Sequence, residues 1–383
     1  MMKSYFDYAA ATPVSEPVLA AMQPYFSDQF YNPSALYLAA AAVKQAVTIA
    51  RQDVARELGC KPSEIVFTAG GTESANLSIH GVMQHFPGGN CVVSATEHEA
   101  VLAPAKQYSC RIAPVRPDGR IDLQAVEDLI DDNTVLVSVM YANNEIGTVQ
   151  PLREIAKIIA RKRAGRRRAP HTDPSKPLYF HTDACQAGNY LPLLTGTLGV
   201  DMMTLNGGKM YGPKQSGVLY VRTGVRLSPQ ILGGGQERNL RSGTENVPGI
   251  IGFAAALKQS AGMREAESKR LRVLQDRIIT TLKQEAPRIV INGTTGYRLP
   301  NNVHITVPAA DNERLMMELD ERGIMVAAGS ACSASSDQPS HVLTAIGLSD
   351  DEARASLRIT LGRGTDDTDV DKLLRNLLEL VAR

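Results

Sequence analysis

The sequence has no tryptophan, only five cysteines in 383 residues, and a formal net charge of only +1. A nearly balanced charge provides no general attraction to nucleic acid or anionic membranes, so direct binding of nucleic acid is not expected. No apolar run is long enough to cross a bilayer, and the opening MMKSYFDYAA lacks the apolar core of a secretory signal peptide. We therefore expect a cytoplasmic protein that does not bind membranes.

The cysteines are odd in number and scattered, and none forms a C-x-x-C pair. Without a secretion signal, this pattern favours reduced thiols over a disulfide framework or a zinc site, and no metal is expected. Cys332 lies in GSACSASSD, a run of small polar residues that predicts an exposed loop. The others lie beside apolar segments or after a predicted helix, as small buried residues often do: Cys60, Cys91, Cys110 and Cys185.

Short apolar runs alternate with helical stretches over the first 257 residues. Leu38–Leu58 is Ala-rich with helical periodicity, and Gly59 supplies a C-terminal stop. Strands interleaved with helices predict an α/β domain whose sheet is covered on both faces. Buried strands are predicted at Ile65–Thr68, Cys91–Ser94, Val135–Tyr141, Leu178–His181, Met202–Leu205 and Val218–Arg222.

The chain is too long for one compact core, so a second domain is expected after a bridging helix at Glu265–Gln284. Strands near Ile289–Ile291 and Val303–Val307 are followed by helix, loop, strand and a closing helix. We expect a large domain at 1–257 and a smaller α+β domain at 258–383. In the closing helix, Thr368 and Asp371 resemble a capping box, and one face is apolar: Val370, Leu373, Leu374, Leu377 and Val381.

The segment IVFTAGGTES is a candidate anion-binding turn. A buried strand ends at Thr68, a Gly-rich turn follows, and a helix begins near Thr72. Free amides at a helix start, glycines that allow close approach and a threonine hydroxyl suit an anion. A plain strand-to-helix turn explains the same residues equally well.

Two further motifs place ionisable side chains after buried strands. Asp183 follows LYFHT at the sheet edge where α/β proteins bind ligands, and it can hold a proton on a heteroaromatic nitrogen with Gln186 nearby. Capping of the next helix is the alternative. Lys209 lies between an apolar strand and a Gly-Pro turn, where a lysine can form a Schiff base, although most lysines are simply solvated.

Together these parts suit a cofactor with a phosphate, a ring nitrogen and an aldehyde, and pyridoxal 5'-phosphate (PLP) has all three. The chain resembles the NifS/IscS type of cysteine desulfurase, within the class V aminotransferases. The resemblance runs in family order from Tyr5 to Thr365. Its motifs are YFDYAAATPV, the NPS turn at 32–34, FTAGGTES, ATEHEAV, YANNEIGTVQP, HTDACQ, GKMYGPK, GGGQE with LRSGTEN, RLPNNVHI, GSACSAS and SLRITLGRGT.

The resemblance implies PLP fold type I. A large domain would contain a mainly parallel seven-stranded sheet, and the extreme N-terminal segment would pack with a small domain that carries the Cys332 loop. It implies conversion of L-cysteine to L-alanine with transfer of sulfur to Cys332 as a persulfide. It further implies a homodimer and delivery of sulfur to an acceptor, for iron–sulfur cluster assembly or for thiolation of tRNA or a cofactor.

The resemblance also assigns roles to single residues. Lys209 would bind the cofactor and move the substrate's Cα proton, and Asp183 would keep the ring nitrogen protonated. His98 would stack on the ring and assist proton transfer as a catalytic residue. The Cys332 thiolate would attack the substrate sulfur. Further cofactor contacts are Gly71 and Thr72 (phosphate), Asn144 and Gln186 (ring substituents), Asn206, and Thr244 from the partner subunit. Substrate contacts are Asn32, Asn144 and Arg358, whose planar fork suits a carboxylate.

The chain departs from the family pattern in three places. Asn206-Gly207-Gly208-Lys209 stands where the family has Ser-x-His-Lys, which predicts weaker retention of PLP. The short C-terminal tail leaves docking of an iron–sulfur scaffold in doubt. Six of the eight residues from Arg161 to Arg168 are basic; a solvated loop is the favoured interpretation, and contact with RNA or an acceptor protein is the alternative.

Two other functions fit parts of the sequence. A different class V PLP enzyme, such as a selenocysteine lyase or an amino-acid lyase, would not need a mobile loop around Cys332. A non-catalytic protein that kept the fold would explain the loss of the histidine before Lys209, although Lys209, Asp183, His98 and Cys332 are all present.

Overall fold

A seven-stranded sheet forms the centre of the larger lobe in the computed structural model, which describes residues 3–168, 176–329 and 338–382. Only β8 runs antiparallel to its neighbours, so the expected mainly parallel sheet is confirmed. The spatial order is β2 (Ile65–Thr68), β8 (Gly217–Val221), β7 (Met202–Asn206), β6 (Tyr179–Asp183), β5 (Thr134–Ser138), β3 (Asn90–Ser94) and β4 (Cys110–Ala113).

All six predicted strands are observed, with bounds shifted by up to three residues at either end. The edge strand β4 was not predicted. Its sequence CRIA buries only Ala113, because an edge strand is covered on fewer sides than a central one. It therefore lacks the continuous apolar run that marks the central strands.

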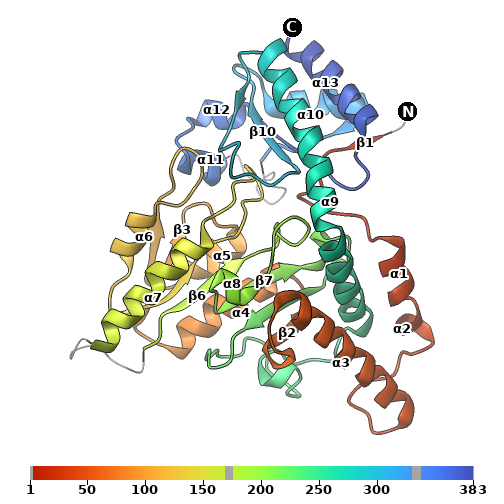
Figure 1. Cartoon of the computed structure of the whole chain (residues 1–383), viewed down its shortest axis with the longest axis vertical. Coiled ribbons are helices and arrows are strands. Elements are labelled where there is room, and N and C mark those ends of the chain that lie inside the picture. Colours follow the sequence, from red (N-terminus) through yellow and green to blue (C-terminus); the bar gives the residue numbers. More distant parts are fainter. Residues whose placement is uncertain (1–2, 169–175, 330–337, 383) are drawn as a thin grey trace.

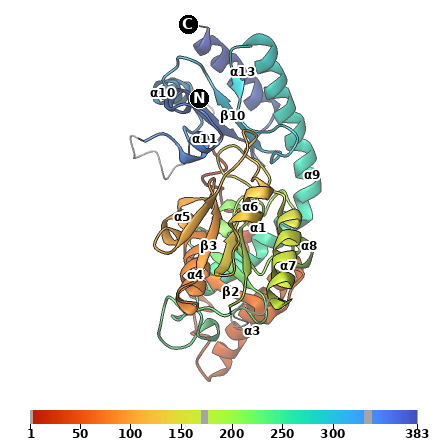
Figure 2. The same cartoon turned by 90° about the vertical axis from the view of Figure 1, so that its left-hand side faces the viewer.

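Helices cover both faces of this sheet (Figure 2). On one face lie α3 (Leu38–Leu58), α6 (Leu123–Leu129), α7 (Leu152–Arg168) and the first part of α9 (Val247–Glu285); α4 (Gly71–His85) and α5 (Glu99–Ala105) cover the other. Alternate residues of a strand enter the two cores, as Val66 and Phe67 of β2 do. Because both faces are buried, the strands are apolar throughout rather than alternating.

The smaller lobe is built on a three-stranded antiparallel sheet in the order β12 (Ser356–Thr360), β10 (Asn302–Thr306) and β9 (Val290–Ile291). Its core joins this sheet to the second part of α9. The lobe also contains α10 (Asn312–Glu321), β11 (Ile324–Met325), α11 (His341–Ala345), α12 (Asp350–Arg354) and α13 (Asp367–Val381). None of the described helices is long and apolar enough to cross a membrane.

The 39-residue helix α9 connects the lobes (Figure 1). Its first part buries Phe253 and Leu257 in the core of the larger lobe, and its second part buries Leu274 and Ile278 in the core of the smaller lobe. The predicted bridging helix is therefore only the second half of α9. The domain boundary expected after residue 257 falls inside this helix.

The start of α13 corrects one prediction. Asp366 accepts a hydrogen bond from Asp369 N, and the Asp369 carboxylate accepts one from Asp366 N. The capping box thus lies two residues before the expected Thr368 and Asp371, because aspartate caps a helix as well as threonine does. The expected apolar face is confirmed: Val370, Leu373, Leu374 and Leu377 are buried, and Val381 packs partly buried against the same core.

The N-terminal segment ties the lobes together. Its strand β1 (Ser4–Tyr5) pairs in parallel with β11 of the smaller lobe. Farther along this segment, Phe6 O accepts a hydrogen bond from Thr360 N of the smaller lobe at 2.7 Å. Thr12 N then donates one to Gly208 O of the larger lobe at 3.1 Å. The segment then continues into α1 (Glu16–Met22) and α2 (Pro24–Ser27) on the larger lobe.

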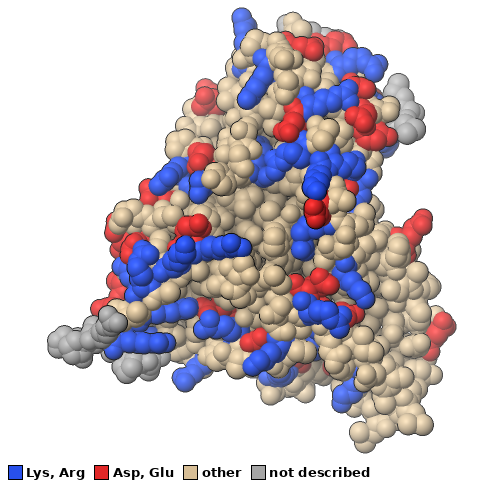
Figure 3. Space-filling model, viewed as in Figure 1, with Lys and Arg blue, Asp and Glu red and all other residues tan. Residues whose placement is uncertain are grey.

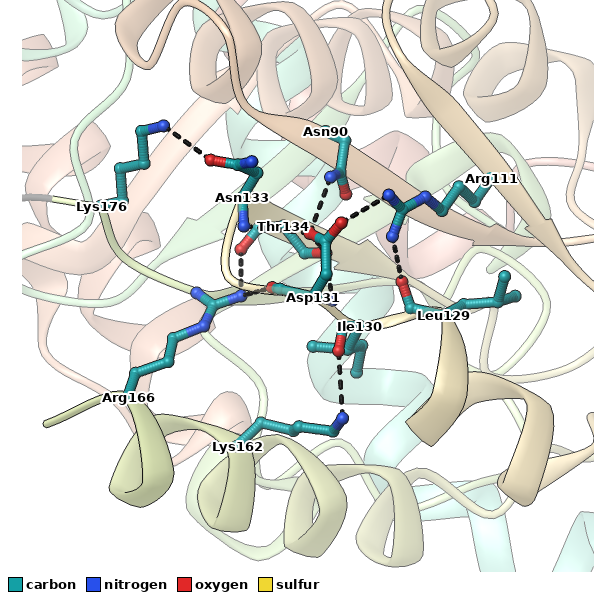
Figure 4. A network of polar contacts seen from close by, with 10 residues as sticks. All are labelled: Asn90, Arg111, Leu129, Ile130, Asp131, Asn133, Thr134, Lys162, Arg166 and Lys176. Carbon is teal, nitrogen blue, oxygen red and sulfur yellow. Dashed lines mark hydrogen bonds and ion pairs between the residues drawn. The ribbon is translucent and has the colours of Figure 1, made fainter. Parts of the chain in front are cut away.

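The basic run at 161–168 is the C-terminal half of α7, so the interpretation as a solvated loop is wrong. Lysine and arginine side chains gather over this helix on one face of the molecule (Figure 3). Lys162 Nζ donates to Ile130 O at 3.0 Å, and Arg166 donates to Thr134 O at 2.8 Å (Figure 4). Arg163 pairs with the buried Asp201. Several of these cations thus form hydrogen bonds or an ion pair with backbone carbonyls and a carboxylate of the same chain.

The turn beneath these side chains is organised by Asp131 (Figure 4). Its carboxylate accepts hydrogen bonds from Asn90 Nδ2 at 2.9 Å and from Arg111 and Thr134. Burial acts to raise the pKa of Asp131, but these hydrogen bonds outweigh burial and hold it below its usual range. The carboxylate therefore stays ionised and orders the turn between α6 and β5.

Candidate active site

A cavity of about 210 Å³ opens beside the carboxyl ends of β5, β6 and β7. This is the sheet edge at which α/β proteins bind ligands. Residues predicted from separate motifs meet in its lining: Gly71, Thr72, His98, Asn144, Asp183, Gln186, Asn206, Lys209 and Arg358.

Lys209 enters the cavity from a tight 3-10 turn, Gly207–Lys209, directly after β7. Asn206 caps this turn, since its Oδ1 accepts a hydrogen bond from Gly208 N at 3.0 Å. A Cβ at position 207 would lie 2.2 Å from Ser216 Oγ, so only glycine fits there. The turn thus places the half-buried Lys209 beside the cavity, at the carboxyl end of β7.

Asp183 ends β6 and is 7% exposed. Its Oδ1 accepts a hydrogen bond from Cys185 N at 2.9 Å, so it caps the following turn and also lines the cavity. Gln186 lies in that turn and donates from Nε2 to Ala9 O at 3.0 Å. This bond brings the N-terminal segment to the cavity wall.

His98 is the N-cap of α5, and its Nδ1 accepts a hydrogen bond from Ala100 N at 3.0 Å. Burial lowers the pKa of His98; Asp183 acts to raise it and Lys209 to lower it, and the net direction is down. At neutral pH the ring is therefore uncharged. Because Nδ1 is an acceptor, the proton resides on Nε2.

The N-terminus of α4 contributes an anion-binding edge. Gly70 has φ of 150°, a conformation that favours glycine, and no side chain caps the helix. At Gly71 a Cβ would lie 2.7 Å from Cys185 Sγ, so the backbone approaches the cavity only because the residue is glycine. A second cavity, of about 420 Å³, shares Gly71, Thr72 and Lys209 and adds Lys214. Amide donors and a lysine suit a phosphate here.

The start of α11 in the smaller lobe contacts the residues next to two cavity-lining side chains, His98 and Asn144. His341 Nε2 donates to Glu97 O at 2.9 Å, and Ser340 Oγ donates to the Glu145 carboxylate at 2.5 Å. Burial raises the pKa of Glu97 and of Glu145. Sequence reasoning missed these two carboxyl groups, although each adjoins a residue that it selected, His98 or Asn144.

Cys185 is the other residue that sequence reasoning missed. It lines the cavity, whereas the sequence suggested only a small buried side chain. Burial, and after it the charge of Asp183, raises the pKa of the Cys185 thiol well above its usual value. A protonated thiol is a poor nucleophile. The position of Cys185, two residues after Asp183, was the sequence feature that could have indicated its place in the cavity.

The remaining predicted residues lie elsewhere. Asn32 is exposed, and its Oδ1 accepts a hydrogen bond from Ser34 N at 2.9 Å. Thr244 is exposed as well, and neither residue lines the cavity of its own chain. Cys332 lies outside the described residues.

A family model described as aminotransferase class V matches residues 4–373. The chain belongs to this family. Cysteine desulfurase IscS 1 of Archaeoglobus fulgidus is 41% identical to this class V protein, covering 99% of the chain and 97% of the relative. Cysteine desulfurase IscS of Methanosarcina thermophila is 39% identical, covering 99% and 92%. Within the family, the chain thus belongs with the NifS/IscS-type cysteine desulfurases.

The class V fold matches solved structures along all or nearly all of its length. A NifS-like protein superposes with a TM-score of 0.90 at 32% identity, and the match covers all of both chains. The protein SspA, solved in complex with cysteine, superposes with a TM-score of 0.79 at 35% identity, covering 94% of this chain and 99% of SspA. The expected type I fold is confirmed by these neighbours.

Proposed function

We propose that this class V protein is a PLP-dependent cysteine desulfurase, which converts L-cysteine to L-alanine and takes the sulfur onto Cys332 as a persulfide. The observation that carries the proposal is the meeting of Lys209, Asp183 and the N-terminus of α4 around one cavity. The names of the relatives and of the cysteine-bound neighbour support the choice of substrate.

The residues present fit PLP. The Lys209 amine would react with the aldehyde, and the Asp183 carboxylate would pair with the protonated ring nitrogen. The start of α4, which no side chain caps, would bind the phosphate together with Thr72. Asn144 and Gln186 line the same cavity and suit the ring substituents. When bound, PLP would hold the amino group of the substrate and withdraw electrons from its Cα.

The side chains of this chain would supply the proton transfers and the orientation. Lys209 Nζ moves the Cα proton, and His98 offers the proton on Nε2 to the reacting groups. Arg358 binds the substrate carboxylate. The apolar Met140 and Ala142 line the cavity beside them and exclude water.

The sulfur step needs a thiolate. Among the described cysteines only Cys185 lines the cavity, and its thiol is protonated. The Cys332 thiolate would therefore attack the substrate sulfur. A sulfur–sulfur bond forms, the carbon–sulfur bond breaks, and its electron pair stays with the carbon skeleton, which is protonated and released as L-alanine.

Mass spectrometry after incubation with L-cysteine tests this assignment. We expect the wild-type protein and Cys185→Ala to gain one sulfur atom on the peptide that contains Cys332, and Cys332→Ala to gain none. Undiminished release of sulfide from L-cysteine by Cys332→Ala would instead indicate another class V activity, such as that of a selenocysteine lyase.

A homodimer in the cytoplasm is part of the proposal, with Thr244 of each subunit reaching the partner's cavity. Exposed apolar side chains on the segment from α2 to the start of α3 support an interface there, where few charged side chains lie (Figure 3): Phe26, Phe30, Leu36, Tyr37 and Leu38. The sulfur would pass to an acceptor protein for iron–sulfur cluster assembly or for thiolation of tRNA or a cofactor.

Replacing Gly208 with histidine is expected to strengthen PLP binding by roughly tenfold, the effect of one additional charge-assisted hydrogen bond. A Cβ at position 208 meets its nearest neighbour, Asn206 Oδ1, at 3.4 Å, which is ordinary van der Waals contact, so the backbone there accepts a Cβ. Absorbance after stepwise dialysis measures retention. Gly208→Ala is the matched control and should retain PLP as the wild type does. Equal retention by all three proteins would show that position 208 does not contact the phosphate.

A further inference from the structure

The buried Arg358 and the partly exposed Asp7 form an ion pair between two cavities. Arg358 is 2% exposed and lines the active-site cavity, whereas Asp7 lines a separate groove of about 500 Å³ in the direction of the smaller lobe. Arg358 Nη2 donates to Asp7 Oδ1 at 2.7 Å. The pair therefore separates the place where the substrate would bind from that groove.

The guanidinium is held at two of its three nitrogens. Nη2 is bound by Asp7, and Nη1 donates to Asn144 O at 3.1 Å. Nε is buried and has no hydrogen-bond partner among the described residues. A buried N–H without an acceptor is unfavourable unless a ligand supplies one. The edge of Arg358 that includes Nε is thus the part left for a ligand oxygen.

Hydrogen bonds hold the backbone of Asp7 in place beside Arg358. Its neighbour Phe6 accepts a hydrogen bond through O from Thr360 N at 2.7 Å, and Thr360 lies two residues after Arg358 on β12. Tyr5 Oη donates to Asp7 O at 2.8 Å. The two members of the pair therefore lie on adjacent extended segments, and the carboxylate has little freedom to leave the arginine.

We propose that Asp7 is a positioning residue. It holds Arg358 so that the Nε edge of Arg358 can donate hydrogen bonds to the carboxylate of the amino-acid substrate. The inference rests on the proposed function only in taking an α-amino acid as the substrate. A rigid anchor raises affinity because the arginine side chain is ordered before the substrate arrives. Asp7 itself does not touch the reacting atoms.

A matched pair of ligands tests the proposal without requiring turnover. L-Alanine and ethylamine differ only in the carboxylate, and binding of each to the PLP-loaded protein is measured from the visible absorbance. For Asp7→Asn we expect the dissociation constant of L-alanine to rise roughly threefold to fivefold, because the neutral amide keeps a weaker hydrogen bond. For Asp7→Ala we expect a rise of roughly tenfold or more. The dissociation constant of ethylamine should change by less than about twofold, because it has no group for Arg358.

Three results would overturn the role of Asp7. Equal weakening of both ligands would mean a general structural role, tighter binding of L-alanine would mean that Asp7 competes with the substrate carboxylate, and no change would mean no role. If Asp7→Ala does not fold because it leaves a buried unpaired cation, Asp7→Asn decides alone. Glu16→Gln on α1 is the control for loss of a carboxylate near the N-terminus. If the wild type binds L-alanine but does not desulfurate L-cysteine, the proposed function fails while this test still stands.

Discussion

Replacing Lys209 with alanine is expected to reduce desulfuration of L-cysteine by at least about 10³-fold and to remove the visible absorbance of the PLP Schiff base. The turn after β7 places this one amine in both cavities, beside Thr72 and Asn206. Under the proposed function, its loss would remove both the covalent link to the cofactor and the group that moves the Cα proton. Absorbance spectra and steady-state kinetics measure the two losses separately.

A second lysine variant serves as the control for Lys209→Ala. Lys269 is exposed on α9 and pairs with Glu265 at 2.7 Å, far along the chain from the cavity residues. Lys269→Ala should keep the absorbance band and the wild-type kcat. If Lys209→Ala kept the band, the Schiff base would have to form on another amine, and the assignment of the cavity would be wrong.

Replacing Asp183 with asparagine is expected to lower kcat by at least about 10²-fold. The amide oxygen can still accept the hydrogen bond from Cys185 N, so the turn after β6 is kept. Asparagine cannot hold a proton on a ring nitrogen by its charge, so the electron-accepting form of the cofactor is no longer favoured. The expected loss is therefore in kcat more than in folding stability.

The pH profile provides a second readout of Asp183→Asn. Asp183 acts to raise the pKa of His98, so its neutralisation should lower the pKa of His98 further. A histidine with a lowered pKa is uncharged above that pKa and charged below it. The acidic limb of the pH–rate profile should therefore move to lower pH. A variant with wild-type kcat and an unmoved profile would show that this carboxylate does not act on the cofactor or on His98.

Much of the site was predictable because each motif contains its own local geometry. Lys209 follows an apolar strand and two glycines, and the structure requires glycine at position 207. Asp183 follows a buried strand, and strand ends of a parallel sheet share one edge. These signals depend on a few neighbouring residues, so they can be recognised in a single sequence.

Other features had no local signal. The basic residues at 161–168 resembled a solvated run, and only their arrangement above the turn at 130–134 shows that several are bound internally. The edge strand β4 was missed because Arg111 interrupts its short apolar run, although pairing with β3 makes it a strand. Contacts between segments far apart in sequence determine both outcomes, and periodicity does not encode such contacts.

The sequence by itself determined the fold class and the central strands, and it singled out Lys209, Asp183 and His98, because these depend on apolar runs and short motifs. Only the tertiary structure decided which side chains those groups meet. It brought Asp7 and Arg358 together across 351 positions and placed Cys185 in the cavity with a protonated thiol. The physical reason is that burial and pairing set the charge state and orientation of a side chain, and both arise only when distant segments pack against each other.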